Sequence, residues 1–370
     1  MSAAKETTAN VLMHLLRVAL GTPTATAVTI HSGLWPEVYR LSARQGVAAI
    51  AWDGLQRLAS EGAISPEQAP DRATKLQWAL AAERTKEQYL KHRRAIVRLA
   101  TIYTEADIKM MILKGFGLSL LYPTPEHRSC SDIDIWLFGE QERADELLRR
   151  RLNIKIDEDK HHHTVFYLDG VMVENHYDFL NIHAHLSNRD IEEQLRERAV
   201  HPDIVEFEGC TIYVPNADCH ALFLLRHAAA HFAAAEIVLR HVTDWAMFIK
   251  HNHAKIDWVW LRDVARHHNM DRFLDAMNVI SSELCNIDLA LMPDTVRRPE
   301  LERRILGDIL SPEFDETMPE RGLLRIVWFK YRRWWANRWK HRLVYREGLI
   351  STFLVQLRSH LLKPKSITHK

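Results

Sequence analysis

Residues 113–137 have the sequence LKGFGLSLLYPTPEHRSCSDIDIWL, and the pattern in this stretch decides the fold. The apolar run at 110–113, which ends at Gly115, predicts a buried strand followed by a turn. FGLSLLYP predicts a short helix that stops before its proline. In SDIDIWLF acidic and apolar residues alternate, and this period of two predicts a strand with Asp132 and Asp134 on one face.

These two aspartates are the strongest chemical signal in the sequence. Side chains two residues apart on a strand point the same way, so their carboxylates can share one or two divalent cations. Paired carboxylates that hold Mg²⁺ against phosphate oxygens commonly promote phosphoryl and nucleotidyl transfer, because the metal neutralises charge that builds on phosphorus. Lys114 and Arg128, which precede the pair, make the combination more specific than two aspartates alone. An exposed strand edge is the alternative interpretation.

The patterns on either side predict an α+β protein. Apolar residues at helical intervals predict an N-terminal helical region over 1–100, with Gly46 as a break and a long helix after the linker at 66–70. The apolar stripe expected on this long helix consists of Leu76, Leu80, Tyr89, Ile96 and Leu99. Residues 101–216 predict a small mixed sheet of about four or five strands, including a hairpin turn at Asp169 and Gly170. Residues 217–370 predict a second helical region that ends in a basic aromatic tail.

Composition excludes several classes of protein. The chain has 370 residues, of which 47% are hydrophobic and 26% charged, as in ordinary globular proteins of two or three units. No apolar run approaches the roughly 20 residues of a membrane span, and the N-terminus has no signal-peptide pattern. Four scattered cysteines without CxxC spacing predict reduced thiols in a cytoplasmic protein. The net charge of +1 argues neither for nor against nucleic acid.

The motifs resemble a known family. LKG, LYP and RSCSDIDI look like the polymerase-β-type nucleotidyltransferase superfamily, and most like its bacterial branch of uncharacterised nucleotidyltransferases. In that branch lysine-glycine replaces the usual glycine-serine after the first strand. VMVENHYDF resembles the late strand that bears a carboxylate, a histidine and an aromatic residue. RHAAAHF and LRHVTDW are similar to helical segments that follow the core, so the resemblance covers roughly residues 30–250.

The resemblance implies a role for each matching position. Asp132 and Asp134 resemble the first two metal-binding carboxylates. Glu174 resembles the third, which in this fold often helps to deprotonate the acceptor hydroxyl. Gly115 resembles the turn glycine that lets backbone amides approach the triphosphate, and Lys114 can neutralise phosphate charge.

Other candidates keep two interpretations each. Phe116 stands where the family has a turn serine, so Ser119, one helical turn further on, is the candidate substitute for phosphate contact. Arg128 either binds nucleotide or pairs with Asp132 or Glu126. His176 binds a nucleotide phosphate, orients Glu174, or is a core histidine. Asp178 is the alternative to Glu174 as the third carboxylate.

The implied function is Mg²⁺-dependent transfer of an NMP group from an NTP, with ATP as the default donor, to an acceptor hydroxyl. Two Mg²⁺ ions are expected, and Mn²⁺ is an alternative. The acceptor class stays open among RNA, a protein or peptide, and a small molecule such as a saccharide precursor. A non-catalytic module that binds nucleotide or nucleic acid is the second hypothesis. The third is a zinc hydrolase built on His227 and His231, which is disfavoured because Ala228 replaces the glutamate of HExxH.

Two further features have competing interpretations. The consecutive His161, His162 and His163 predict a solvated loop or strand start rather than a metal site, and Asp244 is expected to join a structural network with a nearby histidine or Arg240. Residues 321–346 interleave basic and aromatic residues without an acid. We expect a helix that packs through its aromatic side. Binding of nucleic acid, or of a membrane surface or protein partner, is the alternative.

Overall fold

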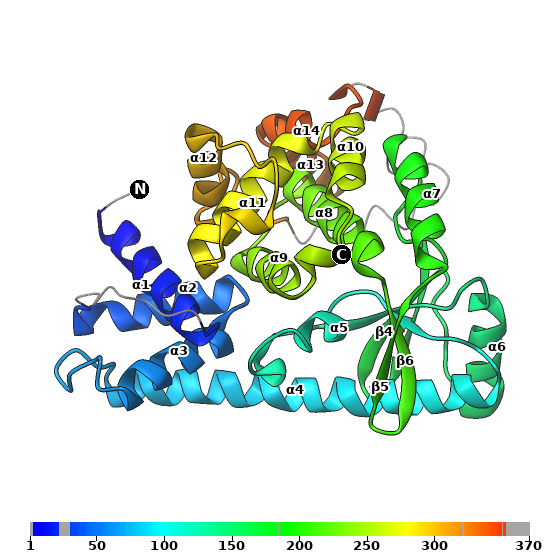
Figure 1. Cartoon of the computed structure of the whole chain (residues 1–370), viewed down its shortest axis with the longest axis horizontal. Helices are drawn as coiled ribbons and strands as arrows, with labels where there is room; N and C mark the ends of the chain where they lie inside the picture. Colours follow the sequence, from blue (N-terminus) through cyan, green and yellow to red (C-terminus); the bar gives the residue numbers. More distant parts are fainter. Residues whose placement is uncertain are drawn as a thin grey trace.

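A mixed sheet of six strands lies at one end of the protein, and helices cover it and extend beyond it (Figure 1). The computed structural model describes residues 3–21, 30–160, 162–183, 185–319, 322–349 and 351–352. The strand order is β3-β4-β2-β1-β6-β5. The strands are β1 (Met111–Ile112), β2 (Asp132–Trp136), β3 (His163–Leu168), β4 (Val171–His176), β5 (Asp203–Phe207) and β6 (Cys210–Val214). The predicted α+β class is confirmed.

The pairing of the strands makes the sheet mixed. β2 is parallel to β4 and antiparallel to β1, whereas β1 is parallel to β6. β3–β4 and β5–β6 are antiparallel hairpins, and the first of them turns at Asp169 and Gly170 as predicted. β5 was not predicted, because this edge strand is mostly exposed and lacks the apolar pattern of a buried strand.

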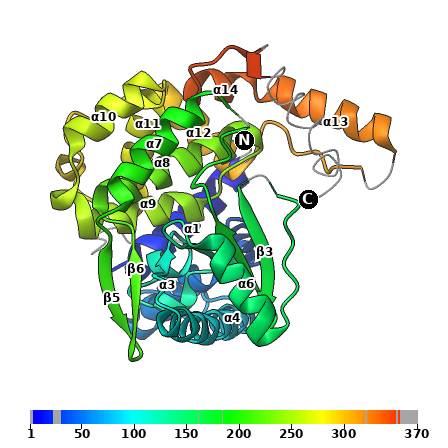
Figure 2. The ribbon, with the colours of Figure 1, turned by 90° about the vertical axis from the view of Figure 1, so that its right-hand side faces the viewer.

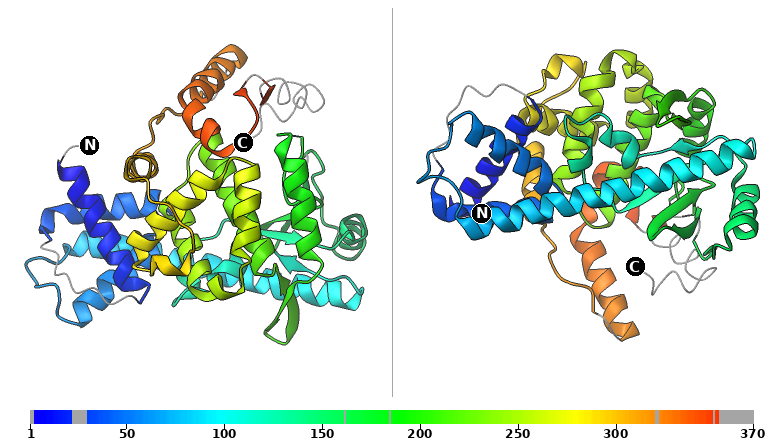
Figure 3. Two further views of the ribbon diagram at one scale, coloured as in Figure 1. Left: turned by 45° about the horizontal axis from the view of Figure 1, so that its top comes forward. Right: turned by 90° about the horizontal axis from the view of Figure 1, so that it is seen from below.

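A long helix runs beneath the sheet and the N-terminal helices (Figures 1 and 3). Asp71 caps this helix, because its carboxylate accepts the Thr74 backbone N–H at 2.9 Å. The expected apolar stripe is wrong at Leu76 and Leu80, which are 59% and 48% exposed, because Trp78 faces the core there instead. The helices up to this point are α1 (Ala3–Ala19), α2 (Trp35–Arg44), α3 (Ala48–Ser60) and α4 (Arg72–Glu105).

Two hydrophobic cores hold these layers together. One joins the second half of α4 to the sheet and to α6, and the other joins the N-terminal helices to the helices that follow the sheet. Arg17 of α1 donates to the carbonyl of Glu283 in α11, at 2.7 Å for the shorter bond. The N-terminal and C-terminal regions therefore share one core, and the boundaries at residues 100 and 216 stay predictions. The remaining α-helices up to residue 310 are α5 (Phe116–Ser119), α6 (Gln141–Leu152), α7 (Ser187–Ala199), α8 (Ala217–Ala234), α9 (Leu239–Asn252), α10 (Trp258–His267), α11 (Asp271–Cys285) and α12 (Pro299–Leu310).

The basic aromatic tail forms two helices with different surroundings, α13 (Leu323–Ala336) and α14 (Arg338–Val344). α14 packs against the body, and its fully buried Lys340 lies with Nζ 2.6 Å from Asp308 Oδ2. α13 projects outward (Figure 2) and leaves Trp328, Tyr331 and Trp335 largely exposed. The expectation of packing is therefore met by α14 and only in part by α13. Residue 321 lies outside the described residues.

No α-helix in the described ranges combines the length and the apolar character that a membrane crossing requires.

Four buried histidines outside the sheet are expected to make the stability of the folded protein sensitive to mild acid. Burial lowers the pKa of His185 to about 2, and that of His220, His268 and His341 to about 4 each, against an ordinary value of 6.5. The unfolded chain therefore binds protons below pH 6.5 that the folded chain refuses, and stability falls as the pH falls. Each histidine contributes up to about 1.4 kcal/mol per pH unit between these limits.

We expect the free energy of unfolding, measured by denaturant titration, to decrease steadily from pH 7 to pH 5. His220→Asn removes one of these groups and should make that decrease less steep. A stability that stays constant over this range would show that these histidines are protonated in the folded protein.

Candidate active site

The parallel pairing of β2 with β4 brings the predicted carboxylates together. Asp134 is the register partner of Glu174, and His176 lies two residues further along β4 on the same face. His176 Nε2 is 3.2 Å from Asp134 Oδ1 and 3.4 Å from Glu174 Oε2. One ligand atom from each of these three residues lies within 4.8 Å of the other two. The sheet thus forms a compact acidic cluster with an imidazole at its centre.

His176 is positively charged in this arrangement. Its Nδ1 is 3.2 Å from the carbonyl oxygen of Asp178, so both ring nitrogens face acceptors. Burial disfavours the charge, but the hydrogen bonds to Asp134 and Glu174 outweigh it and raise the pKa of His176 to about 9. Of the interpretations left open for His176, a contact that orients Glu174 is the one the distances support.

Lys114 pairs with the same aspartate. Its Nζ is 3.1 Å from Asp134 Oδ1. Burial opposes both charges, yet the neighbouring carboxylates, Asp134 first, raise the pKa of Lys114. Lys114 and His176 in turn hold the pKa of Asp134 well below its ordinary value. Asp134 is therefore an anion although it is only 1% exposed.

The residues present fit a divalent cation. Asp134 Oδ2 is buried and has no hydrogen-bond partner among the described residues. A buried carboxylate oxygen without a donor needs an explanation, and a bound ion supplies one. Carboxylates from Asp134 and Glu174 are the hard oxygen ligands that Mg²⁺ prefers. His176 is the third member of this group, and its imidazole can ligate an ion only after it loses a ring proton.

Asp132 stands beside this group but outside the 4.8 Å cluster. Ser131 Oγ donates to its Oδ1 at 3.0 Å. Burial and the like charge of Asp134 raise the pKa of Asp132. A bound cation would reduce this repulsion and so stabilise the charged form of Asp132.

Gly115 forms the turn between β1 and α5. Its φ is +55°, a conformation that residues with a side chain rarely adopt, and an added Cβ would lie 2.8 Å from Cys130 Sγ. Cys130 Sγ itself is 2.9 Å from the backbone carbonyl oxygen of Asp132. The absence of a side chain at Gly115 thus lets this turn lie directly against the start of β2.

Gly115→Ala is expected to lower both stability and nucleotide binding, since the new methyl group strains the backbone and clashes with Cys130 Sγ at the start of β2. We expect a loss of about 1–3 kcal/mol in the free energy of unfolding. Gly170→Ala is the control, because Gly170 also has a positive φ but nothing lies within 4 Å of an added Cβ. Equal effects of the two variants on nucleotide binding would mean that the close approach at Gly115 is unimportant.

Two of the predicted phosphate contacts, Arg128 and Ser119, have hydrogen-bond partners within the protein. Arg128 donates to Asp244 through Nε at 3.0 Å and NH2 at 2.6 Å, and so pairs with neither Asp132 nor Glu126. Ser119 is buried, and its hydroxyl donates to the Phe116 carbonyl oxygen at 2.5 Å. Ser119 does not line the pocket beside Asp132, whereas Arg128 does.

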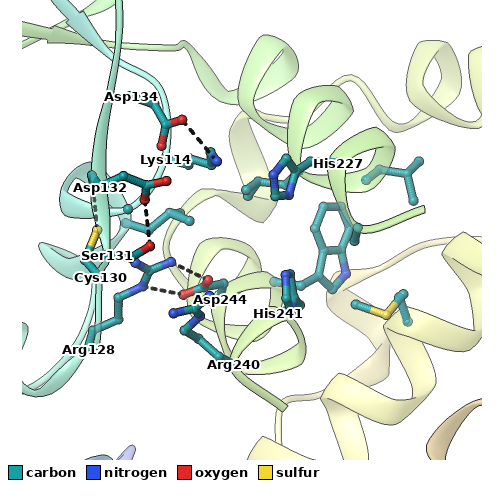
Figure 4. A pocket seen from close by; sticks show the side chains of 17 residues that line it. Lys114, Arg128, Cys130, Ser131, Asp132, Asp134, His227, Arg240, His241 and Asp244 are labelled. Carbon is teal, nitrogen blue, oxygen red and sulfur yellow. Dashed lines mark hydrogen bonds and ion pairs between the residues drawn. The ribbon is translucent and has the colours of Figure 1, made fainter. Parts of the chain in front are cut away.

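That pocket lies between the β1–β2 region and helices α8 and α9 (Figure 4). Lys114, Gly115, Asp132 and Asp134 line one side, and His227, Arg240, His241 and Asp244 line the other. Glu174 and His176 are not among its lining residues. Arg240 and His241 were not predicted as pocket residues. Both lie within the LRHVTDW motif, and this is the signal that could have indicated them.

The histidine motifs have different outcomes. His227 and His231 lie with ring centroids 4.4 Å apart, but neither belongs to a metal-ligand cluster formed by the described residues. His163 is the first residue of β3, as predicted, yet it is buried rather than solvated, and it groups with His162 and His176. His161 lies outside the described residues.

A mixed sheet with paired aspartates on one strand, a third carboxylate on its parallel neighbour and a glycine turn before them defines a nucleotidyltransferase-like α+β protein. The family model described as uncharacterised nucleotidyltransferase matches residues 31–286. The chain belongs to this family, so the resemblance stated from the motifs is confirmed. No curated protein and no solved structure matches the chain.

Proposed function

We propose that this protein transfers a nucleoside monophosphate group from an NTP to an acceptor hydroxyl in an Mg²⁺-dependent reaction. The observation that carries the proposal is the Asp134–Glu174 register pair, together with the unpartnered buried oxygen of Asp134. Asp132, Asp134 and Glu174 are the residues that would hold two ions, with Mn²⁺ as an alternative to Mg²⁺. Mg²⁺ bound there supplies neutralisation of the charge that develops on the α-phosphate.

The chain's own residues contribute three further actions. Glu174 lies at the edge of the acidic cluster and accepts the proton of the acceptor hydroxyl, while the contact with His176 holds its carboxylate in place. Lys114 lines the pocket and can exchange its contact with Asp134 for one with the departing pyrophosphate. The Gly115 turn brings backbone close to the same space.

The identity of the NTP donor and the class of the acceptor belong to the same proposal. ATP is the default donor, since the described pocket residues give no indication of the base. The acceptor is a hydroxyl of RNA, of a protein or peptide, or of a small molecule such as a saccharide precursor, because this fold serves many acceptors. A cytoplasmic location suits an enzyme that consumes NTPs.

The experiment incubates the protein with each α-³²P-labelled NTP, with and without Mg²⁺, in separate pools of RNA, protein and small molecules. Label that enters one pool with the intact protein, and not with an Asp132→Asn/Asp134→Asn variant, supports the proposal and identifies donor and acceptor class together. NTP binding without transfer to any pool favours the non-catalytic module. Absence of both binding and transfer contradicts the assignment of the carboxylates.

A further inference from the structure

The pocket wall opposite the carboxylates carries the nitrogen groups of one arginine and two histidines, and no metal-binding role accounts for it. Burial lowers the pKa of both His227 and His241, so these imidazoles are neutral and Arg240 carries the positive charge of the wall. His227 from α8 and the neighbouring Arg240 and His241 from α9 face Lys114 and Asp132 across the pocket (Figure 4). All three side chains are half-buried. The ring centroids of His227 and His241 are 6.3 Å apart, so both imidazoles belong to one patch.

Hydrogen bonds within the wall leave donors available. His241 Nδ1 lies 3.1 Å from the backbone nitrogen of Val238 and 3.3 Å from the carbonyl oxygen of the same residue. In the tautomer in which Nδ1 accepts the backbone N–H, Nε2 carries the ring proton. Arg240 uses NH1 for Ser129, at 3.3 Å to the carbonyl oxygen and 3.4 Å to Oγ. Its Nε and NH2 make no hydrogen bond to the described residues. The wall therefore offers N–H groups without a protein acceptor.

Among the described residues that line this wall, Asp244 is the one carboxylate, and it is already neutralised. Asp244 accepts two hydrogen bonds from Arg128 and one from the Tyr122 hydroxyl, at 2.8 Å. Both of its oxygens are thus occupied, and little acceptor capacity remains for the N–H groups of a base. Trp245, the aromatic residue at this side, is only 3% exposed and presents no open face for stacking. Donors without acceptors fit an anion better than a nucleobase.

We propose that His227, Arg240 and His241 bind the β- and γ-phosphates of the NTP and hold the pyrophosphate as it leaves. This inference rests on the proposed function. The acceptor oxygen forms a bond to the α-phosphorus while the bond from that phosphorus to the bridging oxygen breaks. The acceptor proton passes to Glu174, and the bond electrons leave with pyrophosphate, whose charge the wall and Lys114 stabilise from two sides. The α8–α9 helices thereby supply the contact that the missing turn serine does not.

Calorimetric titration of the full-length protein with inorganic pyrophosphate in Mg²⁺ tests the wall directly. His227→Gln and His241→Gln should each weaken pyrophosphate binding about tenfold, the value of one hydrogen bond to a charged group. Glutamine at position 241 keeps an acceptor for the start of α9, since glutamine at this third helical position commonly bonds back to the cap. Arg240→Gln is an independent variant of the same wall.

The matched control is His251→Gln, on the same helix but exposed and outside the pocket, which should bind pyrophosphate like the unaltered protein. Unchanged binding in variants that melt like the unaltered protein overturns the inference. The inference is also overturned if the variants lose binding of adenosine, used as a probe for the base, but keep binding of pyrophosphate. That result would assign the wall to the nucleobase. Wall-dependent pyrophosphate binding without any nucleotidyl transfer would retain the anion subsite and reject the enzymatic function. Nucleotidyl transfer that is unaffected by the wall variants would retain the enzymatic function and reject the anion subsite.

Discussion

Replacing Asp132 with asparagine is expected to reduce nucleotidyl transfer by about 10³-fold, comparable to the loss of a major electrostatic contact in other active sites. The same change should leave the melting temperature unchanged or slightly higher. Among the described residues the Asp132 carboxylate accepts one hydrogen bond, from Ser131, and its charge is repelled by Asp134. Asparagine keeps the shape and removes the repulsion, so activity and stability should move independently.

This separation makes Asp132 more informative than Asp134. Asparagine at 134 would leave Lys114 and His176 without their shared counter-ion, so lost activity would be mixed with lost stability. Asp263→Asn, an exposed position on α10, is the control and should change neither quantity. Transfer assays and thermal melting measure both effects. If the Asp132 variant retains more than about a tenth of the activity, the carboxylate does not hold a catalytic metal.

Local pattern was sufficient to predict the strand that carries Asp132 and Asp134. Alternation over a few residues determines which face each side chain takes, and the tight turn at Gly115 follows from the glycine after an apolar run. These features depend on neighbours in sequence. Glu174 is different: its position beside Asp134 depends on the parallel register of β2 with β4, which the residues alone do not specify, and only the family resemblance indicated it.

The features that were not predicted from the sequence depend on tertiary packing between distant segments. Arg128 and Asp244 are 116 positions apart, and nothing in either segment predicts their pairing. Arg240 and His241 become pocket residues only because α9 packs beside the β1–α5 turn. Leu76 and Leu80 follow a helical stripe, but α4 turns a different face to the N-terminal helices. In each case the sequence gives the residue type, and the packing partner gives its role.

Breaking the Arg128–Asp244 ion pair is expected to have the second largest effect, a loss of stability. Asp244→Asn should lower the free energy of unfolding by about 3–5 kcal/mol, because it leaves the buried guanidinium of Arg128 without a counter-ion. Both side chains are at most 9% exposed, so water cannot replace the lost carboxylate. The pair links the segment before β2 to α9, and its loss should therefore also loosen the pocket and weaken NTP binding.

Denaturant unfolding of three variants distinguishes this effect from a simple loss of packing. Arg128→Met combined with Asp244→Leu should recover part of the stability that Asp244→Asn loses, since no uncompensated charge then remains buried. The recovered protein should still bind NTP poorly, because the hydrogen bonds that fix the loop before Asp132 are gone. If the double variant is instead less stable than Asp244→Asn, packing around Tyr122 and the two side chains, rather than the buried charge, determines the loss. If Asp244→Asn alone is neutral, Arg128 has found another anion, and the pair does not connect α9 to the active-site strand.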